Sequence, residues 1–104
     1  MIESDAGFSL ERVGLNKLVY REGNKQTTCT IEYYGKGPIL GVVYLAEWSD
    51  YWDAPLDTVR VSDEEWKRVG DNIREAYRWQ GFEVDIYCPP AENRERSRPT
   101  LPPP

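Results

Sequence analysis

The segment 62–82 carries a complete set of signals for one amphipathic helix. Ser62 and Glu65 have the spacing of a capping box, in which each side chain accepts a hydrogen bond from the backbone of the other residue. Gly81 followed by Phe82 has the form of a helix C-cap with an apolar residue just beyond it. Between these ends, apolar residues recur at helical spacing, at Trp66, Val69, Ile73 and Tyr77. A single apolar stripe on a single helix indicates that the helix packs against a sheet.

Strand-like runs surround this helix, three before it and one after it. Residues 16–22 and 27–34 are separated by a Gly-Asn turn pair, which is typical of a β-hairpin. The nearly continuous apolar run 39–48 is expected to form the central strand, covered on both faces. Residues 83–88 alternate as a last strand. The predicted fold class is α+β: a small antiparallel sheet in β-β-β-α-β order, with one amphipathic helix packed on one face and a disordered Pro-rich C-terminal tail.

Side-chain alternation assigns the two faces of the run 27–34, because successive side chains of a strand point to opposite sides of a sheet. One face holds Thr27, Cys29, Ile31 and Tyr33. The other face holds Thr28, Thr30, Glu32 and Tyr34. We expect the first of these to face the core.

The length of 104 residues predicts one domain, at residues 1–88. Its first fifteen residues are ambiguous, since Phe8, Leu10 and Val13 suit either a short helix or an edge strand. Residues 89–104 combine proline with charge and contain little that is apolar, which predicts a disordered tail.

The tail contains one recognisable short pattern. Arg96, Pro99 and Pro102 have the Arg-x-x-Pro-x-x-Pro spacing of polyproline ligands of SH3 domains. The pattern is short, and a Pro-rich tail is more often a solubilising end than a recognition element.

The charge balance restricts the partners that the chain is expected to bind. Eighteen acidic residues against thirteen basic ones give a net charge of −5, which repels nucleic-acid backbones and anionic membranes and favours a basic protein. The sequence shows neither the pattern of a signal peptide nor an apolar stretch long enough to span a bilayer. We therefore expect a cytoplasmic protein that binds neither nucleic acid nor membrane.

The composition also argues against an enzyme. There is no histidine, so the usual general base, the Ser-His-Asp and Cys-His arrangements and imidazole metal ligands are all missing. No phosphate-binding or dinucleotide-binding motif is present, and two cysteines do not complete a zinc site. We expect no catalytic residues, metal or cofactor, and we expect Cys29 and Cys88 to be buried free thiols rather than a disulfide.

The most informative segment is a loop in which large aromatic residues alternate with carboxylates. Between positions 47 and 65 there are seven acidic residues and one basic residue. Aromatic rings with a carboxylate rim resemble a protein-binding hot spot, because the rings supply buried area and the acids steer a basic partner. The predicted partner-binding residues are Glu47, Trp48, Asp50, Tyr51, Trp52, Asp53 and Asp57.

Two other interpretations of this loop stay open. Trp48 and Trp52 could fold back as a lid on the core, which would leave ordinary solvated acids around them. Glu47, Asp50 and Asp53 could instead act as paired carboxylates in a catalytic cleft. Trp79 raises a similar question, because it lies away from the apolar stripe of the helix and needs cover from the N-terminal segment, the tail or a partner.

Several short motifs occur together between roughly residues 17 and 87. They are a Tyr-Arg-Glu-Gly turn, a Val-Val-Tyr-Leu strand, a Trp-Asp-x-Pro loop, a Ser-Asp-Glu-Glu cap and a final Gly-Phe-Glu-Val. In this combination the chain resembles a family of small bacterial immunity proteins of polymorphic toxin systems. The matching positions are Val43, Tyr44, Leu45, Trp52, Asp53, Pro55, Ile73, Ala76, Gly81 and Val84. The resemblance implies neutralisation of a cognate toxin by occluding or distorting its active site, without catalysis.

The leading hypothesis is thus an immunity-like protein that binds a basic toxin domain through the aromatic loop. The alternative is an adaptor or phage-encoded regulatory protein that docks a host protein through its acidic face or its Pro-rich tail. A histidine-free carboxylate enzyme is a third hypothesis, and a homodimer formed through an unpaired strand edge also stays open.

Overall fold

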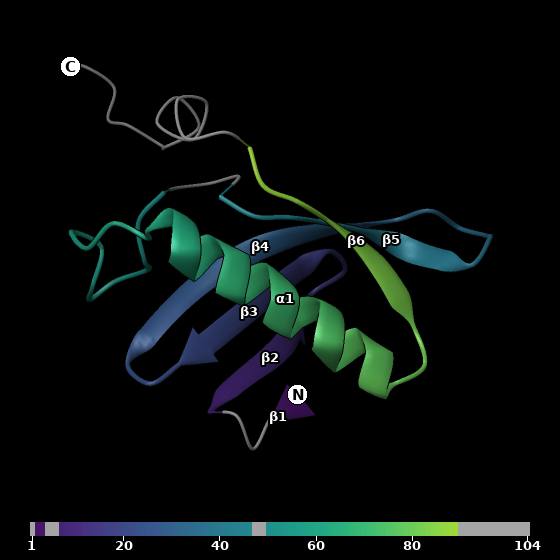
Figure 1. Ribbon diagram of the computed structural model, residues 1–104, viewed down its shortest axis with the longest axis horizontal. Helices are drawn as coiled ribbons and strands as arrows, with labels where there is room; N and C mark the ends of the chain where they lie inside the picture. Colours follow the sequence, from purple (N-terminus) through teal and green to yellow (C-terminus); the bar gives the residue numbers. More distant parts are fainter. Residues whose placement is uncertain (1, 4–6, 47–49, 90–104) are drawn as a thin grey trace.

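A single sheet carries most of the chain, and one helix lies diagonally across one of its faces (Figure 1). The computed structural model describes residues 2–3, 7–46 and 50–89. The sheet has six strands in the order β1-β2-β3-β4-β5-β6, which is also their order in the chain. The α+β class and the single helix on one face are therefore confirmed. The tail from residue 90 onward, with its Arg96, Pro99 and Pro102 pattern, lies outside the described residues.

The strand bounds show where the sequence prediction was right and where it was incomplete. The strands are β1 (Ile2–Glu3), β2 (Phe8–Val13), β3 (Lys17–Glu22), β4 (Lys25–Tyr33), β5 (Ile39–Tyr44) and β6 (Glu83–Tyr87). The hairpin and the last strand are where they were predicted. The ambiguous N-terminal segment forms a strand, because its apolar residues Phe8 and Leu10 are two positions apart and both face the core.

Two features of the predicted sheet were wrong, and the first is the pairing, which is not antiparallel throughout. The strands β1 to β5 form an antiparallel meander, whereas β6 pairs with β5 in parallel. The reason is the connection, since the chain leaves β5, forms a loop and the helix, and returns in the same direction, as parallel neighbours require. The run 39–48 is also not central, because β5 lies next to the edge strand β6 and ends at Tyr44.

The helix α1 (Asp63–Trp79) has the ends that its sequence predicts. Ser62 Oγ accepts a hydrogen bond from the Glu65 amide at 3.1 Å, and Glu65 Oε1 accepts one from the Ser62 amide at 2.9 Å. At the other end, Gly81 adopts a φ of +87° and the Phe82 amide bonds the carbonyl of Tyr77, as in a Schellman motif. The capping box and the glycine cap are both confirmed.

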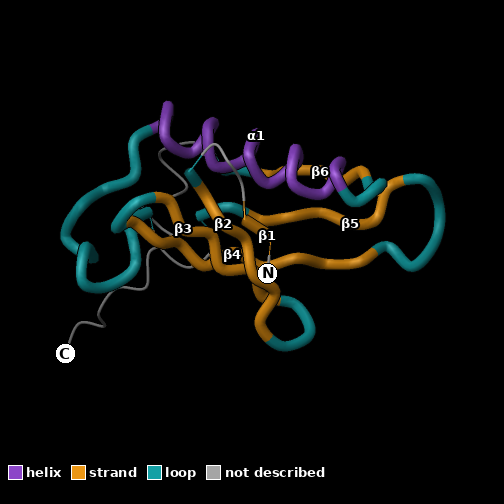
Figure 2. The backbone as a smooth tube through the Cα atoms, turned by 90° about the horizontal axis from the view of Figure 1, so that it is seen from below, coloured by secondary structure: helices purple, strands orange, loops and turns teal. Residues whose placement is uncertain are grey.

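The core lies between the helix and the face of the sheet that it covers (Figure 2). The predicted helix stripe is buried, and so are Thr27, Cys29 and Ile31 of β4. Tyr33, predicted on the same face, is 39% exposed because it lies at the end of β4, beside a cavity at the helix C-terminus. Cys29 and Cys88 form no disulfide with each other, and Cys29 is buried as expected, whereas Cys88 lies just after β6 and is only half-buried.

Two glycines allow backbone and helix to approach closely. A Cβ atom at Gly41 of β5 would lie 2.2 Å from the carbonyl oxygen of Glu32, so this position excludes any side chain. Gly70 brings α1 against β6, where a Cβ would lie 3.0 Å from the Ile86 Cγ2 atom. These contacts fix how closely β5 lies to β4 and how closely α1 lies to β6.

Trp79, at the last residue of the helix, is partly covered from the N-terminal segment. Its ring stacks on Phe8 of β2, with centroids 6.1 Å apart. Phe8 stacks in turn on Tyr20 at 5.6 Å. The N-terminal segment thus supplies the cover that the sequence required, while Trp79 remains 53% exposed.

Candidate protein-interaction surface

Asp50, one of the predicted partner-binding residues, lies inside the protein. Its carboxylate accepts a hydrogen bond from Trp66 Nε1 at 2.8 Å and one from Arg60 Nε at 2.7 Å. The side chain is 1% exposed, and its charge is balanced by Arg60. Asp50 therefore anchors the loop to the helix, and the folded surface does not present it to a partner.

Trp52 is also buried, at 1% exposed, and belongs to the hydrophobic core. Lys25 Nζ lies 5.4 Å from the centroid of its ring, within the range of a cation–π contact. The indole nitrogen of Trp52 has no hydrogen-bond partner among the described residues. This placement favours the lid interpretation for Trp52.

Asp53 fastens the same loop to the sheet. Its Oδ2 atom accepts hydrogen bonds from Thr28 Oγ1 at 2.8 Å and Gln26 Nε2 at 3.2 Å, and its backbone amide bonds the Gln26 carbonyl at 2.7 Å. Thr28 and Gln26 alternate with the buried side chains of β4 and so lie on the face away from the helix. Asp53 therefore lies at the rim of that second face.

The remaining predicted site residues differ in exposure. Tyr51 is half-buried and its backbone bridges to Arg60, whereas Asp57 is exposed. Glu47 and Trp48 lie outside the described residues. Asp50 and Asp53, which the catalytic interpretation would pair, have separate partners, one set in the interior and the other on the sheet. The described part of the loop thus presents mainly Asp57, with Tyr51 and Asp53 partly accessible.

The sheet has a second face, and among the described residues no helix covers it (Figure 2). Tyrosines and carboxylates from β4, β5 and β6, together with Tyr34 just after β4, gather there. We call this cluster the tyrosine face. It consists of Glu32, Tyr34, Tyr44, Asp85 and Tyr87.

The members of the tyrosine face contact one another directly. Tyr44 and Tyr87 are register partners on β5 and β6, and their rings meet edge to face with centroids 6.0 Å apart. The Tyr44 hydroxyl donates to Glu32 Oε1 at 3.1 Å, and the Tyr34 hydroxyl donates to Asp85 Oδ2 at 2.8 Å. These contacts order the rings before any partner arrives.

The tyrosine face carries two carboxylates, Glu32 and Asp85. The hydrogen bond to Asp85 raises the pKa of the Tyr34 hydroxyl, and nearby Tyr44 and Glu32 add to this effect. Neither β5 nor β6 contains a lysine or arginine. Tyr34 and Tyr87 are 46% and 50% exposed, so the rings are accessible and the carboxylates lie beside them. Such a surface suits a partner that brings cationic side chains to aromatic rings.

None of these residues was predicted as part of a site, although the sequence contained a signal. Tyr34 and Glu32 were assigned to the second face of β4, and Asp85 and Tyr87 alternate with apolar residues on the last strand. A single helix covers only one face of a sheet this wide, so aromatic side chains on the other face stay exposed.

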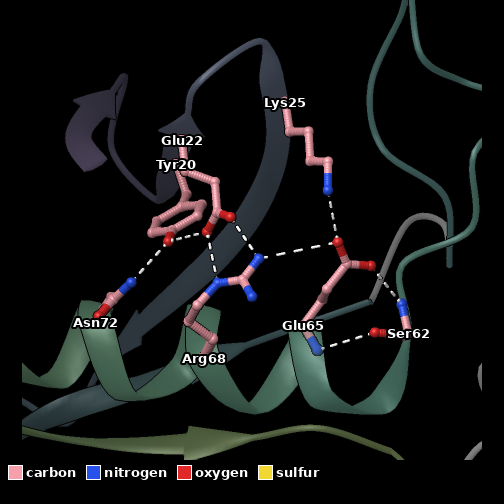
Figure 3. A network of polar contacts seen from close by, with 7 residues as sticks. All are labelled: Tyr20, Glu22, Lys25, Ser62, Glu65, Arg68 and Asn72. Carbon is pink, nitrogen blue, oxygen red and sulfur yellow. Dashed lines mark hydrogen bonds and ion pairs between the residues drawn. The ribbon is translucent and has the colours of Figure 1, made fainter. Parts of the chain in front are cut away.

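A second polar cluster joins the helix to the β3–β4 hairpin (Figure 3). Arg68 bonds both carboxylate oxygens of Glu22 and lies 3.8 Å from Glu65, which accepts a bond from Lys25 at 2.7 Å. Tyr20, fully buried, donates to Glu22 at 2.5 Å and accepts from Asn72 at 2.8 Å. Every charge here has a partner of opposite sign, which indicates a structural role. We call this cluster the helix clasp.

Neither a metal site nor a membrane span emerges from the described part of the chain. No group of three or more Cys, Asp or Glu side chains there could hold a metal ion. The one described helix is too short and too polar to cross a bilayer. Comparison of the chain with protein-family models, with curated proteins and with solved structures finds no match.

Proposed function

We propose that this chain is a binding protein of the immunity type, which neutralises a basic toxin domain by direct protein contact and without catalysis. The observation that carries the proposal is the tyrosine face, an ordered set of accessible rings and carboxylates on an uncovered sheet. Tyrosines are common at the centre of protein interfaces because each ring buries a large area at a small cost in side-chain entropy.

The acidic charge of the chain supports the same proposal. Glu32 and Asp85 lie within the tyrosine face, and Asp53 lies at the rim of the same side of the sheet. A basic partner would be steered toward this side and would meet the rings there. Relative to the sequence-based site, the contact moves from the interior residues Asp50 and Trp52 to the sheet, while Asp57 stays available at the neighbouring loop.

The test has two steps and uses the full chain. Immobilised wild-type protein and a Tyr87→Ala variant are compared for retention of proteins from a lysate of the source cells. Trp79→Ala is the matched control, because Trp79 is equally exposed but lies on the helix side of the sheet. We expect one basic protein to be retained by the wild type and the control and to be lost from Tyr87→Ala.

The retained protein is then expressed in a bacterial host, alone and together with this chain. Growth arrest that wild-type protein relieves and Tyr87→Ala does not would support both the immunity role and the surface. A retained protein that is harmless when expressed alone would overturn the immunity role. Equal relief of growth arrest by wild type and Tyr87→Ala would overturn the surface.

A further inference from the structure

A cavity of about 350 Å³ lies beside the C-terminal end of the helix, where Tyr77, Gln80 and Phe82 form part of its lining. The cavity is on the helix side of the sheet, so it is separate from the tyrosine face. Its volume falls within the range of about 300 to 1,000 Å³ that is typical of small-molecule sites. We call it the helix-end cavity.

One part of the helix-end cavity is apolar. Leu10 of β2 and Leu18 of β3 form part of the lining from the sheet, and both belong to the core. Leu40 of β5 and Phe82, which follows the helix, add apolar surface and are more accessible. This part of the lining suits an apolar body.

Four polar side chains line the same cavity: Arg12, Tyr33, Tyr77 and Gln80. Arg12 donates from an Nη atom to the Tyr33 hydroxyl at 3.1 Å. Burial raises the pKa of Tyr77 to about 12, with Tyr33 adding to the rise and the charge of Arg12 opposing it, so the Tyr77 hydroxyl lies near both groups. The Tyr77 hydroxyl therefore carries its proton at neutral pH and can donate a hydrogen bond.

Arg12 differs from most of the described arginines, because no described carboxylate pairs with it. Arg21, Arg60, Arg68 and Arg78 each pair with a carboxylate. The interaction that the structure gives Arg12 is with the Tyr33 hydroxyl, which leaves most of its five N–H donors available. In a chain of net charge −5, this is a localised cationic site beside an apolar cavity.

We propose that the helix-end cavity binds a small carboxylic acid with an apolar body. The carboxylate is held by the Arg12 guanidinium and the Tyr77 hydroxyl, and the body packs on Leu10, Leu40 and Phe82. Arginine matches a carboxylate because its planar fork donates two parallel hydrogen bonds. This site is independent of the proposed function, because it uses the other side of the sheet and different residues.

The experiment is an NMR titration of the full chain, monitoring the leucine methyl groups. The probe is 4-phenylbutyrate, and two control probes each remove one half of it: 4-phenylbutanol lacks the charge and acetate lacks the apolar body. We expect 4-phenylbutyrate to shift the methyl signals of Leu10, Leu18 and Leu40 in a saturable way. The alcohol should bind about tenfold more weakly or worse, and acetate should not saturate.

Two variants test the polar end of the site. Arg12→Gln should weaken phenylbutyrate binding about tenfold or more and leave binding of the alcohol unchanged. Arg74→Gln, which removes the same charge from a helix residue lining a different cavity, should have no effect. Tyr77→Phe removes only the hydroxyl and should weaken binding of phenylbutyrate but not of the alcohol. This variant keeps the test decisive if Arg12→Gln folds poorly.

Three results would overturn the proposal. No saturable shift with phenylbutyrate would show that the cavity does not take this class of ligand. Equal binding of the acid and the alcohol would show that Arg12 does not recognise a carboxylate. Shifts confined to leucines outside the cavity, such as Leu45 and Leu56, would place the binding elsewhere.

Discussion

The indole N–H of Trp66 donates a 2.8 Å hydrogen bond to the carboxylate of Asp50, and both side chains are shut away from solvent. Trp66 belongs to the first turns of α1, and Asp50 begins the described part of the loop that leads to it. The bond therefore joins the loop to the helix from within the core, and Arg60 balances the charge from the surface side.

Removing this buried carboxylate is expected to destabilise the fold. Asp50→Ala leaves the Trp66 N–H and the Arg60 guanidinium without their acceptor, and we expect a loss of about 2 to 3 kcal/mol in the free energy of unfolding. Urea denaturation at neutral pH measures it. Asp57→Ala, at an exposed position of the same loop, should change stability by no more than about 0.5 kcal/mol. A loss as small for Asp50→Ala would contradict the anchoring role.

The two closely packed glycines predict different responses to alanine. Gly41→Ala places a methyl group against the backbone of β4, which has to move, and we expect a loss of about 2 kcal/mol or more. Gly70→Ala meets side chains only, at Ile86 Cγ2 and Leu45 Cδ1, and gains about 1 kcal/mol in helix propensity, so the net change should be small. Thermal unfolding of both variants separates the cases, and equal losses would argue against the close β4–β5 approach.

The helix clasp predicts loss of stability in acid. Burial pushes the pKa of Glu22 upward, but hydrogen bonds from Arg68 and Tyr20 outweigh it and hold that pKa below its ordinary value. A hydrogen bond from Lys25, followed by that of the Ser62 amide, lowers the pKa of Glu65. The unfolded chain therefore binds these protons more readily, so the stabilisation is present at neutral pH and is lost as pH falls through the folded-state pKa values.

The measurement is the free energy of unfolding from urea titrations between pH 7 and pH 3. Glu22→Gln should be less stable than wild type at pH 7 and should lose less stability on acidification, because one of the linked protons is gone. Glu75→Gln, on an exposed part of the helix outside the clasp, should keep the wild-type pH profile. If Glu22→Gln lost stability on acidification as steeply as the wild type, Glu22 would be excluded as a source of the pH dependence.

Charge reversal on the tyrosine face is expected to slow binding of a basic partner. Asp85→Lys should lower the association rate and flatten its dependence on ionic strength, with a smaller effect on dissociation. Glu75→Lys makes the same change in net charge on the helix side and should matter less. Surface plasmon resonance at low and high salt compares them. Asp57→Lys reports on the loop predicted from the sequence, and a larger effect there than at Asp85 would return the contact to that loop.

Local signals explain why the helix could be predicted to within a residue. The capping residues Ser62, Glu65 and Gly81 each act on backbone groups a few residues away. Their effect on the helix ends therefore does not depend on the rest of the fold. The ends of strands are different. The strand β5 ends at Tyr44 although apolar residues continue, and Ala46 adopts a φ of +56° that breaks the extended chain.

The partners of the loop residues could not be read from local sequence. Asp50 and Trp52 are residue types that are common in exposed hot spots. They are buried here because Asp50 bonds Arg60 and Trp66 and because Trp52 packs in the core. The parallel pairing of β6 is likewise decided by the path of the chain around the helix. The alternation of side chains along a strand does not show in which direction its neighbour runs.

The parallel pair formed by β5 and β6 also predicts an order of assembly. The hairpins from β2 to β5 close over short turns, whereas β6 reaches its neighbour only after the loop and α1 have been placed. Asp85 and Tyr87 arrive with that last strand, so the tyrosine face is completed only when the final long-range contact has formed. Recognition of a partner at this surface would then report that the whole chain has folded.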